Sequence, residues 1–483
     1  MSGWSARRVA EEAGAELLGG FPDADSPAPA GDGPPAVTLD SRRVAGGELF
    51  VGLAGERDDG GSFARSALDA GAWGALVAPE HARPLLGAGS CPAGGGVVLA
   101  HPDPLRGLQA LARAWRHELG SRGARVVAIT GSTGKTSTKD ILAGLIGGRV
   151  RTAATPANLN TEIGLPLAIL AAPADTECLV LEMAMRGPGQ IAELTAIAEP
   201  DVGVIVNVGP SHLELLGSLE AIAAAKAELI DGLAPGSVAV VPAAEPLLAR
   251  HLRGDVRTIT FGEGGDVALA ELHRDGSVTI AAGGDRIELW PSFSQAHNLR
   301  NLLAAVAVAR ALEIEVGGRL EVSFSAMRGE RVELPGGVVV IDDCYNANPM
   351  SMAAAIDDLA ETAPGRRVAV LGEMLELGPE SPRMHREVGF HAAERGVTLL
   401  LAVGPLAAET AEAFTGEAHW VADADAAAAL LPTLLIDGDT VLVKASRGVG
   451  LERVLPAVAS RSPGARPSRE ALQAAPGAGP GRL

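Results

Sequence analysis

Short apolar runs alternate with helical patterns through the middle of the chain. Four of these runs begin at residues 125, 178, 202 and 238, and their sequences are RVVAIT, CLVLEM, VGVIVNVG and VAVVP. Most of them end in a polar or glycine-rich segment, which a helical pattern follows. Buried strands that alternate with helices predict a mainly parallel sheet, in which ligands bind at the carboxyl ends of the strands.

The same pattern returns on a smaller scale after about residue 317, in VVVIDD, RVAVLGEM, TLLLAVG and TVLVKAS. These runs predict a C-terminal, doubly wound, Rossmann-like α/β domain. The first part of the chain has two strand-like stretches, AVTLDSRRV and ELFVGL, followed by a helical pattern at FARSALDAGAWGALV. A helix predicted at residues 105–119 leads from this small α/β domain into the middle of the chain.

The chain is therefore predicted to be an α/β protein of three domains. Their expected bounds are 1–118, 119–316 and 317–460. Residues 461–483 are rich in proline, glycine and alanine. We expect this tail to be disordered, because it has too few apolar side chains to form a core.

Composition and charge narrow the class of protein. Of the 483 residues, 47% are hydrophobic and 20% are charged, which is typical of a globular enzyme. The formal net charge of −19 disfavours binding to nucleic acid or to an anionic membrane surface, but a local basic site could still bind an anionic small substrate. The sequence has no apolar run long enough for a membrane span, and its three cysteines are far apart. We therefore expect a cytoplasmic protein.

The segment ITGSTGKTST, residues 129–138, has the features of a nucleotide phosphate-binding loop. It follows a buried strand, contains two glycines that free the backbone, and begins a helix with Gly-Lys-Thr. In such loops backbone N–H groups bind phosphate oxygens, the lysine approaches the β- and γ-phosphates, and the threonine hydroxyl reaches Mg²⁺. The alternative is a turn with a solvated lysine, which would not require all these features together. The residues predicted to bind ATP are Gly131, Ser132, Thr133, Gly134, Lys135, Thr136 and Ser137.

This loop is shorter than the common phosphate-binding loop. The usual pattern GxxxxGK[ST] has a glycine at the place of Ile129, whereas this chain has G-x-x-G-K-T. The short spacing disfavours a generic ATPase.

Three further residues are candidates for the metal side of the site. Glu182 ends the run CLVLE, where a carboxylate commonly binds Mg²⁺ directly or through water, or else caps the next helix. His212 also follows a buried strand, although a lone histidine is more often structural. Lys226 lies in an otherwise apolar or acidic helix, where a lysine is usually solvated.

His297, Asn298 and Asn301 stand at the start of a long helix rich in alanine, leucine and valine. Asn298 and Asn301 share one helical face, and their amides match the donor and acceptor edge of adenine. Asn298 could instead, or in addition, cap the helix.

The order of these motifs resembles that of the Mur ligase family, whose members are ATP-dependent, amide-forming ligases of bacterial cell-wall assembly. The resemblance rests on GSTGKTST, NLNTEIGLP, LEMAMRGPGQI, NVGPSHLELLGSLEAIAAAKAE and AHNLRNLLAA. It extends from about Thr38 to Val458. In the C-terminal region IDDCYNANPMSM, VLGEMLELG and LVKASRG resemble the members that add D-alanyl-D-alanine.

The resemblance implies roles for the residues that match the family's motifs. The catalytic and metal-binding centre would consist of Lys135, Thr136, Glu182, His212 and Lys226. Lys226 would be carbamylated, and the new carboxylate would help to hold a second Mg²⁺. The nucleotide contacts would come from His297, Asn298, Asn301, Arg328 and Asp343, with Arg331 as a rival of Arg328 near the γ-phosphate.

The resemblance also implies substrate contacts. The UDP-linked substrate would be bound by Ser41 and Arg42, in a DSR motif, and by Asn160 and Thr161, in NLNTEIGLP. Lys444 and Arg447 are candidates for the carboxylate of the dipeptide, because a free carboxylate needs a cation, although both could be ordinary surface bases. Three positions depart from the family: Ala184 and Ala445 replace glycines, and Gly61 replaces the histidine of a DGHDF-like stretch.

The implied activity is ATP-dependent joining of D-alanyl-D-alanine to UDP-N-acetylmuramoyl-tripeptide through an acyl phosphate, by a monomeric enzyme of peptidoglycan synthesis. One rival adds the third amino acid to UDP-N-acetylmuramoyl-dipeptide, but the DNPR-like motif of its diaminopimelate-specific versions is missing. A folylpolyglutamate-type synthetase shares the loop but lacks the N-terminal DSR region. A nucleotide-dependent switch or scaffold without ligation is an alternative of a different class.

Overall fold

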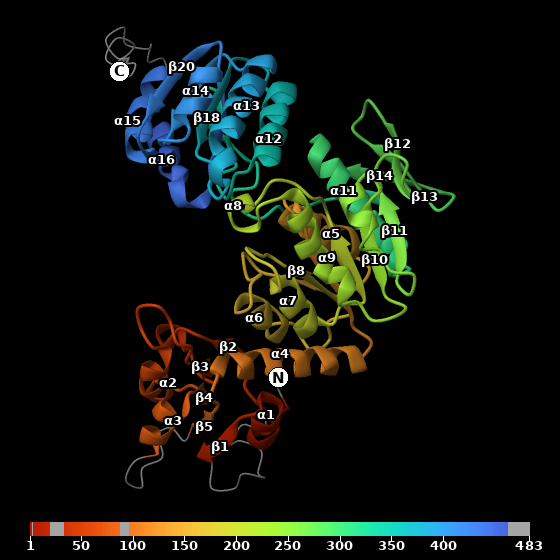
Figure 1. Ribbon diagram of the computed structural model, residues 1–483, viewed down its shortest axis with the longest axis vertical. Coiled ribbons are helices and arrows are strands. Elements are labelled where there is room, and N and C mark those ends of the chain that lie inside the picture. Colours follow the sequence, from red (N-terminus) through yellow and green to blue (C-terminus); the bar gives the residue numbers. More distant parts are fainter. Residues whose placement is uncertain (2, 20–32, 87–95, 462–483) are drawn as a thin grey trace.

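The computed structural model describes residues 1, 3–19, 33–86 and 96–461, in three α/β domains that follow one another along its long axis (Figure 1). Within these residues the N-terminal domain has a five-stranded sheet, the middle domain a ten-stranded sheet and the C-terminal domain a six-stranded sheet. The predicted three-domain α/β fold is confirmed. The tail predicted to be disordered lies, apart from Arg461, outside the described residues.

The N-terminal domain is built on a mostly parallel sheet. Its elements are α1 (Ala6–Ala13), β1 (Glu16–Gly19), β2 (Val37–Thr38), η1 (Ser41–Arg43), β3 (Leu49–Val51), η2 (Gly60–Phe63), α2 (Ala64–Asp69), β4 (Gly74–Val77), α3 (Pro79–Leu85) and β5 (Val97–Ala100). The sheet has the order β1-β5-β4-β3-β2, and β1 runs antiparallel to β5. The carboxyl ends of β2, β3 and β4 therefore lie at one edge of the sheet.

The helical pattern predicted at residues 63–77 is partly wrong. Helix α2 ends at Asp69, and Gly74–Val77 forms the buried strand β4 between β3 and β5. Gly71, with a φ of +95°, turns the chain between the two elements. A short apolar run fits a buried strand as well as a helix, so periodicity alone does not separate them.

Helix α4 (Pro104–Ser121) confirms the helix predicted at 105–119 and joins the first two domains (Figure 1). Its apolar face packs against α1 and against α6 (Gly164–Leu170) of the middle domain. Trp115 lies in this contact: its ring meets that of Trp4 edge-on at 5.8 Å, and its Nε1 donates to the carbonyl oxygen of Ala172 at 3.1 Å. The two domains therefore share one apolar core.

The middle domain is built around β6, whose neighbours in the sheet are β8 and β9. Its strands are β6 (Arg125–Thr130), β7 (Thr152–Ala154), β8 (Cys178–Glu182), β9 (Val202–Ile205), β10 (Val238–Pro242), β11 (Arg257–Phe261), β12 (Val267–Leu272), β13 (Val278–Ala282), β14 (Asp285–Pro291) and β15 (Gly318–Leu320). Its helices besides α6 are α5 (Lys135–Gly147), α7 (Gln190–Ala198), α8 (Leu213–Leu216), α9 (Leu219–Asp231), α10 (Pro246–Ala249) and α11 (Ala296–Ala311).

This sheet has the order β15-β14-β13-β12-β11-β10-β9-β6-β8-β7, and neighbours from β7 to β12 are parallel. The strands predicted from the four apolar runs are β6, β8, β9 and β10. The antiparallel strands β13 and β14 were not predicted. Strand β15 pairs with β14, so it belongs to this sheet although it follows the expected boundary at residue 316.

The C-terminal domain has the predicted doubly wound form. Its elements are β16 (Glu330–Leu334), β17 (Val338–Asp342), α12 (Pro349–Thr362), β18 (Arg367–Gly372), η4 (Gly378–Glu380), α13 (Ser381–Glu394), β19 (Leu399–Val403), α14 (Ala408–Ala413), β20 (Glu417–Val421), α15 (Ala424–Leu434), β21 (Thr440–Lys444), η5 (Arg447–Val449), η6 (Leu451–Arg453) and α16 (Val454–Ala459). The order is β16-β17-β21-β18-β19-β20, and β16 runs antiparallel to β17. The four predicted strands are β17, β18, β19 and β21.

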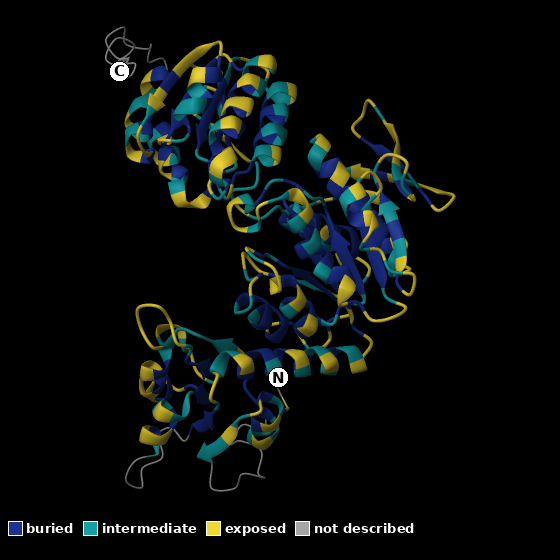
Figure 2. Ribbon diagram, in the orientation of Figure 1, coloured by how far each residue is buried: buried dark blue, intermediate teal, exposed yellow. Residues whose placement is uncertain are grey.

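Most strands of the three sheets are buried, whereas the helices expose one side (Figure 2). Strands β8 and β21, for example, are buried along their whole length. Parallel strands covered on both faces need apolar side chains on both faces, which explains why the predicted runs are continuous rather than alternating. Among the described helices, none is long and apolar enough to cross a membrane.

We expect Trp115→Ala to lower the free energy of unfolding by about 3–5 kcal/mol, because it opens a cavity in the core shared by two domains. Trp115→Phe should cost less, since it keeps most of the ring contact with Trp4. Urea unfolding followed by circular dichroism measures both. Equal losses for the two variants would contradict this account of the packing.

Candidate active site

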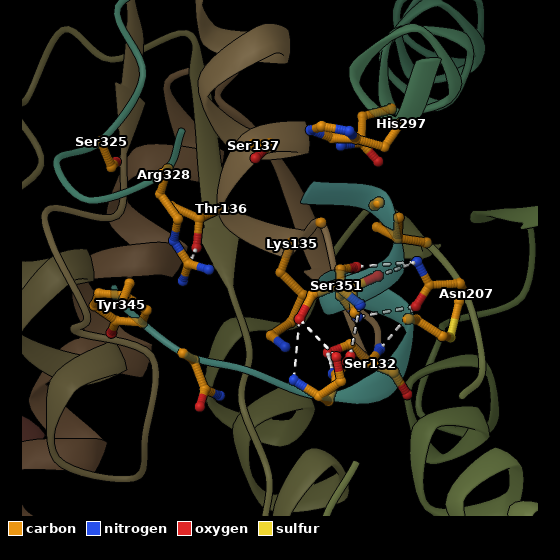
Figure 3. A pocket seen from close by; sticks show the side chains of 18 of the residues that line it. Ser132, Lys135, Thr136, Ser137, Asn207, His297, Ser325, Arg328, Tyr345 and Ser351 are labelled. Atoms are coloured by element: carbon orange, nitrogen blue, oxygen red, sulfur yellow. Dashed lines mark hydrogen bonds between the residues drawn. The ribbon is translucent and has the colours of Figure 1, made fainter. Parts of the chain in front are cut away.

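A cleft of about 2110 Å³ contains most of the residues predicted for the site. It is lined by the phosphate loop and the start of α5, by the start of α11, by the segment 324–331 that joins the last two domains, and by loops that follow β17, β18 and β21. Leu39 of the N-terminal domain also borders it. All three domains therefore contribute to one cleft, and Figure 3 shows its centre.

The loop between β6 and α5 has a shape that requires glycine at its end. Gly134 precedes α5 with a φ of +76°, and a Cβ at this position would lie 2.7 Å from the side-chain oxygen of Asn301. Any other residue would be both strained and in collision. The first turn of α5 has backbone N–H groups without intrahelical acceptors, and together with the helix dipole they favour an anion.

Asn207, which the sequence reasoning missed, braces this loop from the chain that follows β9 (Figure 3). Its Oδ1 accepts hydrogen bonds from the backbone N–H groups of Ser132 at 3.1 Å and Thr133 at 2.9 Å. Its Nδ2 donates to the carbonyl oxygen of Thr133 at 3.1 Å. Since these two N–H groups are bonded to Asn207, those of residues 134–137 are the better candidates for phosphate.

Lys135 lies over its own loop. Its Nζ donates to the carbonyl oxygen of Gly131 at 2.7 Å. Burial lowers the pKa of Lys135, against the opposing effect of the Glu182 carboxylate. The Nζ of Lys135 therefore lies at the loop, and its contact with the phosphates stays a prediction.

Thr136, in the first turn of α5, contacts Glu182 at the end of β8. The Thr136 hydroxyl donates to Oε2 of Glu182 at 2.8 Å, and the amide of Asn160 donates to Oε1 at 2.7 Å. Glu182 does not cap the next helix, since α7 begins eight residues later with Gly189 as its N-cap. Asn160, predicted as a substrate contact, orients this carboxylate. The interpretation of Glu182 as the cap of the next helix is therefore excluded.

Arg328 reaches the same point from the segment that joins the domains. Its Nη2 donates to Oγ1 of Thr136 at 3.2 Å, and its guanidinium lies over the ring of Tyr345, 3.9 Å from the centroid. Its rival, Arg331, is paired with Asp358 at 2.8 Å. The geometry therefore favours Arg328 for the γ-phosphate. Tyr345, the one tyrosine of the chain, was not predicted.

His212 precedes α8 with a φ of +56°, a conformation that is uncommon for a residue with a side chain. Its Nδ1 is hydrogen-bonded to the carboxylate of Glu376, which belongs to the C-terminal domain. Burial lowers the pKa of His212, and Glu376 opposes this effect. The pair links two domains beside the phosphate loop.

The turn that carries Glu376 is held by two further contacts. The carbonyl oxygen of Glu376 accepts from the N–H of Glu214 at 3.1 Å. The buried His385 accepts from the N–H of Met374, two residues earlier, at 3.0 Å. Sequence reasoning missed Glu376, although it lies in the quoted motif VLGEMLELG.

Lys226 is not the solvated lysine that its helix pattern suggests. Its side chain lies in α9 with 1% of the residue exposed, and its Nζ has no hydrogen bond or ion pair with any described residue. Burial lowers the pKa of Lys226 well below its ordinary value, and Lys135 lowers it further. The buried amine is therefore favoured in its neutral form.

His297, Asn298 and Asn301 all line the cleft. The N-cap of α11 is Gln295, so Asn298 is not the cap. Nδ2 of Asn301 donates to Oδ1 of Asn298 at 3.4 Å, and Asn301 packs against Gly134 of the loop. The contact of these residues with adenine stays a prediction.

Lys444 and Arg447 differ in their surroundings. Lys444 is buried, and its Nζ donates to Oδ2 of Asp343 at 2.6 Å and to the carbonyl oxygen of Asn346 at 2.9 Å. Because its charge is balanced, Lys444 is a poor candidate for the dipeptide carboxylate and is not a surface base. Arg447 is exposed at the cleft, 3.3 Å from Glu452, and is the better candidate.

The residues predicted for the nucleotide sugar lie in two places. Asn160 and Thr161 line the cleft, whereas Ser41 and Arg42 lie on η1 outside its lining. Arg42 binds both oxygens of Asp40, at 2.8 and 2.9 Å, and holds the pKa of that carboxyl at about 2. The structure therefore separates the DSR motif from the phosphate loop.

The oxygen atoms of Thr136 and Glu182 fit Mg²⁺, which is usually bound by one or two carboxylates together with water and substrate phosphates. Over the part of the chain that the structure describes, no group of three His, Cys, Asp or Glu side chains could hold a metal.

Two family models match the chain. The Mur ligase middle domain matches residues 129–309, and the Mur ligase, glutamate ligase domain matches residues 327–447. The UDP-N-acetylmuramoyl-tripeptide–D-alanyl-D-alanine ligase of Bacillus subtilis (strain 168) is 36% identical over 433 residues, covering 87% of this chain and 92% of the relative. The ligase of that name from Synechocystis sp. is 37% identical over 438 residues, covering 88% and 92%.

Solved structures agree with these relatives. MurF from Acinetobacter baumannii has a TM-score of 0.82 and 26% identity, covering 95% of this chain and 99% of that one. MurF ligase from Thermotoga maritima in complex with ADP has a TM-score of 0.76 and 33% identity, covering 88% and 97%.

Three α/β domains around one cleft, with a phosphate loop, a buried carboxylate and an arginine from the joining segment, define an ATP-dependent ligase. The chain belongs to the Mur ligase family. The family predicted from the order of the motifs is confirmed.

We expect Tyr345→Ala to lower kcat/KM for ATP by about 2- to 30-fold, because a cation–π contact contributes roughly 0.5–2 kcal/mol. Tyr345→Phe keeps the ring under Arg328 and should stay close to the wild type. Steady-state kinetics with varied ATP measures both. If Phe and Ala were equally impaired, the hydroxyl rather than the ring would be the important group.

Proposed function

We propose that this chain joins D-alanyl-D-alanine to UDP-N-acetylmuramoyl-tripeptide, with ATP converted to ADP and phosphate. The observation that carries the proposal is the single cleft bordered by all three domains, with the phosphate loop at its centre. Relatives that are 36–37% identical over most of the chain have this activity in their names. The product would be the UDP-linked pentapeptide of peptidoglycan synthesis.

The chemistry has two steps. A carboxylate oxygen of the tripeptide attacks the γ-phosphorus of ATP, the bond to the bridging oxygen breaks, and ADP leaves. The amine nitrogen of the dipeptide then attacks the acyl carbon, phosphate leaves with the bonding electrons, and the nitrogen loses a proton to give the amide. The first step brings two anions together, so its barrier depends on positive charge at the phosphates.

Residues of this chain supply that charge and hold the reactants. Lys135 and Arg328 lie on the two sides of Thr136, and the N–H groups of the first turn of α5 are oriented by the helix. Contacts between the last two domains, such as that of His212 with Glu376, hold the C-terminal domain against the phosphate loop, and closure of these domains would keep water away from a reactive acyl phosphate. Mg²⁺, when bound, would neutralise phosphate charge, with Thr136 and Glu182 as its protein partners.

Lys226 would become a carbamate. Its neutral amine nitrogen can attack the carbon of CO₂ and lose a proton, which converts a buried base into an anion. The lowered pKa of Lys226 supports this step, because only the unprotonated amine is nucleophilic. With His212, the carbamate would help to hold a second Mg²⁺.

We further propose that the domains divide near residues 118 and 316. Helix α4 crosses the first of these boundaries, and β15 lies just beyond the second.

We also propose that the enzyme is a cytoplasmic monomer.

Product analysis tests the proposed activity. With ATP, Mg²⁺, UDP-N-acetylmuramoyl-tripeptide and D-alanyl-D-alanine, we expect phosphate release and the mass of the pentapeptide product. Phosphate should not appear at a comparable rate with ATP alone, which distinguishes a ligase from a nucleotide-dependent switch. Replacing the dipeptide by free amino acids, with UDP-N-acetylmuramoyl-dipeptide as acceptor, tests the ligase for the third residue. Product in that arm and not in the first would refute the proposal.

Carbamylation has its own readout. With ¹³C-bicarbonate, the wild type should show a carbamate carbon signal by NMR that is lost in Lys226→Met. Lys139→Met is the matched control, because Lys139 is also a buried lysine of the middle domain but is paired with Asp140 at 2.6 Å. A signal that survives in Lys226→Met would place the carbamate elsewhere.

A further inference from the structure

The space beside Gly61 is filled by another residue. Gly61, which stands where the family's DGHDF-like stretch has histidine, is buried, and its φ lies outside the left-handed region. Its backbone would therefore accept any side chain. A Cβ on Gly61 would, however, lie 2.3 Å from Cδ2 and 2.7 Å from Cγ of His81. The imidazole of His81 thus occupies the volume that a side chain at position 61 would enter.

His81 is held in this place by Asp59. Nε2 of His81 lies 2.7 Å from Oδ2 of Asp59, and Oδ1 of the same carboxylate accepts from the N–H of Gly61 at 2.9 Å. An ionised carboxylate can only accept, so Nε2 is the donor. Nδ1 has no hydrogen-bond partner in the described part of the chain, and 23% of the His81 side chain is exposed. One ring nitrogen is therefore fixed by Asp59, and the other has no protein partner among the described residues.

The pair lies where a parallel sheet binds ligands. Strands β2, β3 and β4 are parallel, and their carboxyl ends lead to η1, to the loop with Gly61 and to α3 with His81. Ser41 and Arg42, the residues predicted for the uridine nucleotide, lie on η1. His81 therefore shares one sheet edge with the DSR motif.

We propose that His81 supplies, from α3, the imidazole that the family places at position 61, and that it binds the uridine-nucleotide end of the substrate. This inference rests on the proposed function, because it requires a uridine nucleotide at this edge. Position 61 is then glycine because the imidazole of His81 already fills the space that a side chain at position 61 would need.

An exchange of the two residues tests the relocation. His81→Ala should weaken binding of UDP-N-acetylmuramoyl-tripeptide, measured by calorimetry without ATP, by about tenfold, the size of one hydrogen bond. Gly61→His should weaken binding at least as much, because the new side chain collides with His81. The double variant Gly61→His/His81→Ala should bind within about threefold of the wild type, because its imidazole enters the vacated space.

The controls separate binding from folding. His117→Ala removes a similar histidine–carboxylate pair, in which His117 of α4 lies 2.8 Å from Glu199, and should leave binding unchanged. The KM for ATP and the thermal midpoint of His81→Ala should stay close to the wild type. A double variant that binds no better than His81→Ala, or a His81→Ala that binds as the wild type does, would overturn the inference. If the wild type itself does not bind this substrate, the proposed function fails instead.

Discussion

The shape of the phosphate loop depends on Asn207, whose one side-chain amide bonds to three backbone atoms of Ser132 and Thr133. A loop shorter than the common form has fewer groups of its own to satisfy these atoms, and the chain after the neighbouring strand supplies the missing partners. The sheet order places β9 beside β6, so the fold brings Asn207 to the loop. With the loop in this shape, Thr136 reaches Glu182 and Gly134 fits against Asn301.

The C-terminal domain also meets this loop. Asn348, the N-cap of α12, donates from Nδ2 to the carbonyl oxygen of Ser132 at 3.4 Å. Met350 packs against Gly209, and only glycine fits at this position. A Cβ on Gly209 would lie 1.9 Å from Sδ of Met350. Together with Glu376 on His212, these contacts join the loop to the domain that would present the dipeptide. The loop and the C-terminal domain therefore contact each other directly, and Arg328 lies on the segment that joins the last two domains.

Local patterns predicted the parallel strands, the loop and the order of the domains. They failed where distant segments meet: nothing near Glu376 or Tyr345 in the sequence indicates that His212 and Arg328 are their partners. The polarity of a helix pattern suggested a solvated Lys226, but packing of α9 on the sheet buries it. Ala445 was a departure from the family with no visible compensation, yet its methyl packs against Gly372, which has no Cβ to obstruct it.

Net charge and local charge act separately in this protein. The chain is acidic overall, but charges farther away than roughly 8 Å are largely screened at physiological ionic strength, whereas those inside a cleft are screened less. Whether a basic side chain can attract an anion depends on whether a carboxylate already neutralises it and on how deeply it is buried. Lys444 of the cleft lining is neutralised by Asp343, and outside that lining burial favours the neutral form of Lys226. The guanidinium of Arg328, which is always charged, donates to Thr136, so the attraction for an anion lies beside the phosphate loop rather than across the whole surface.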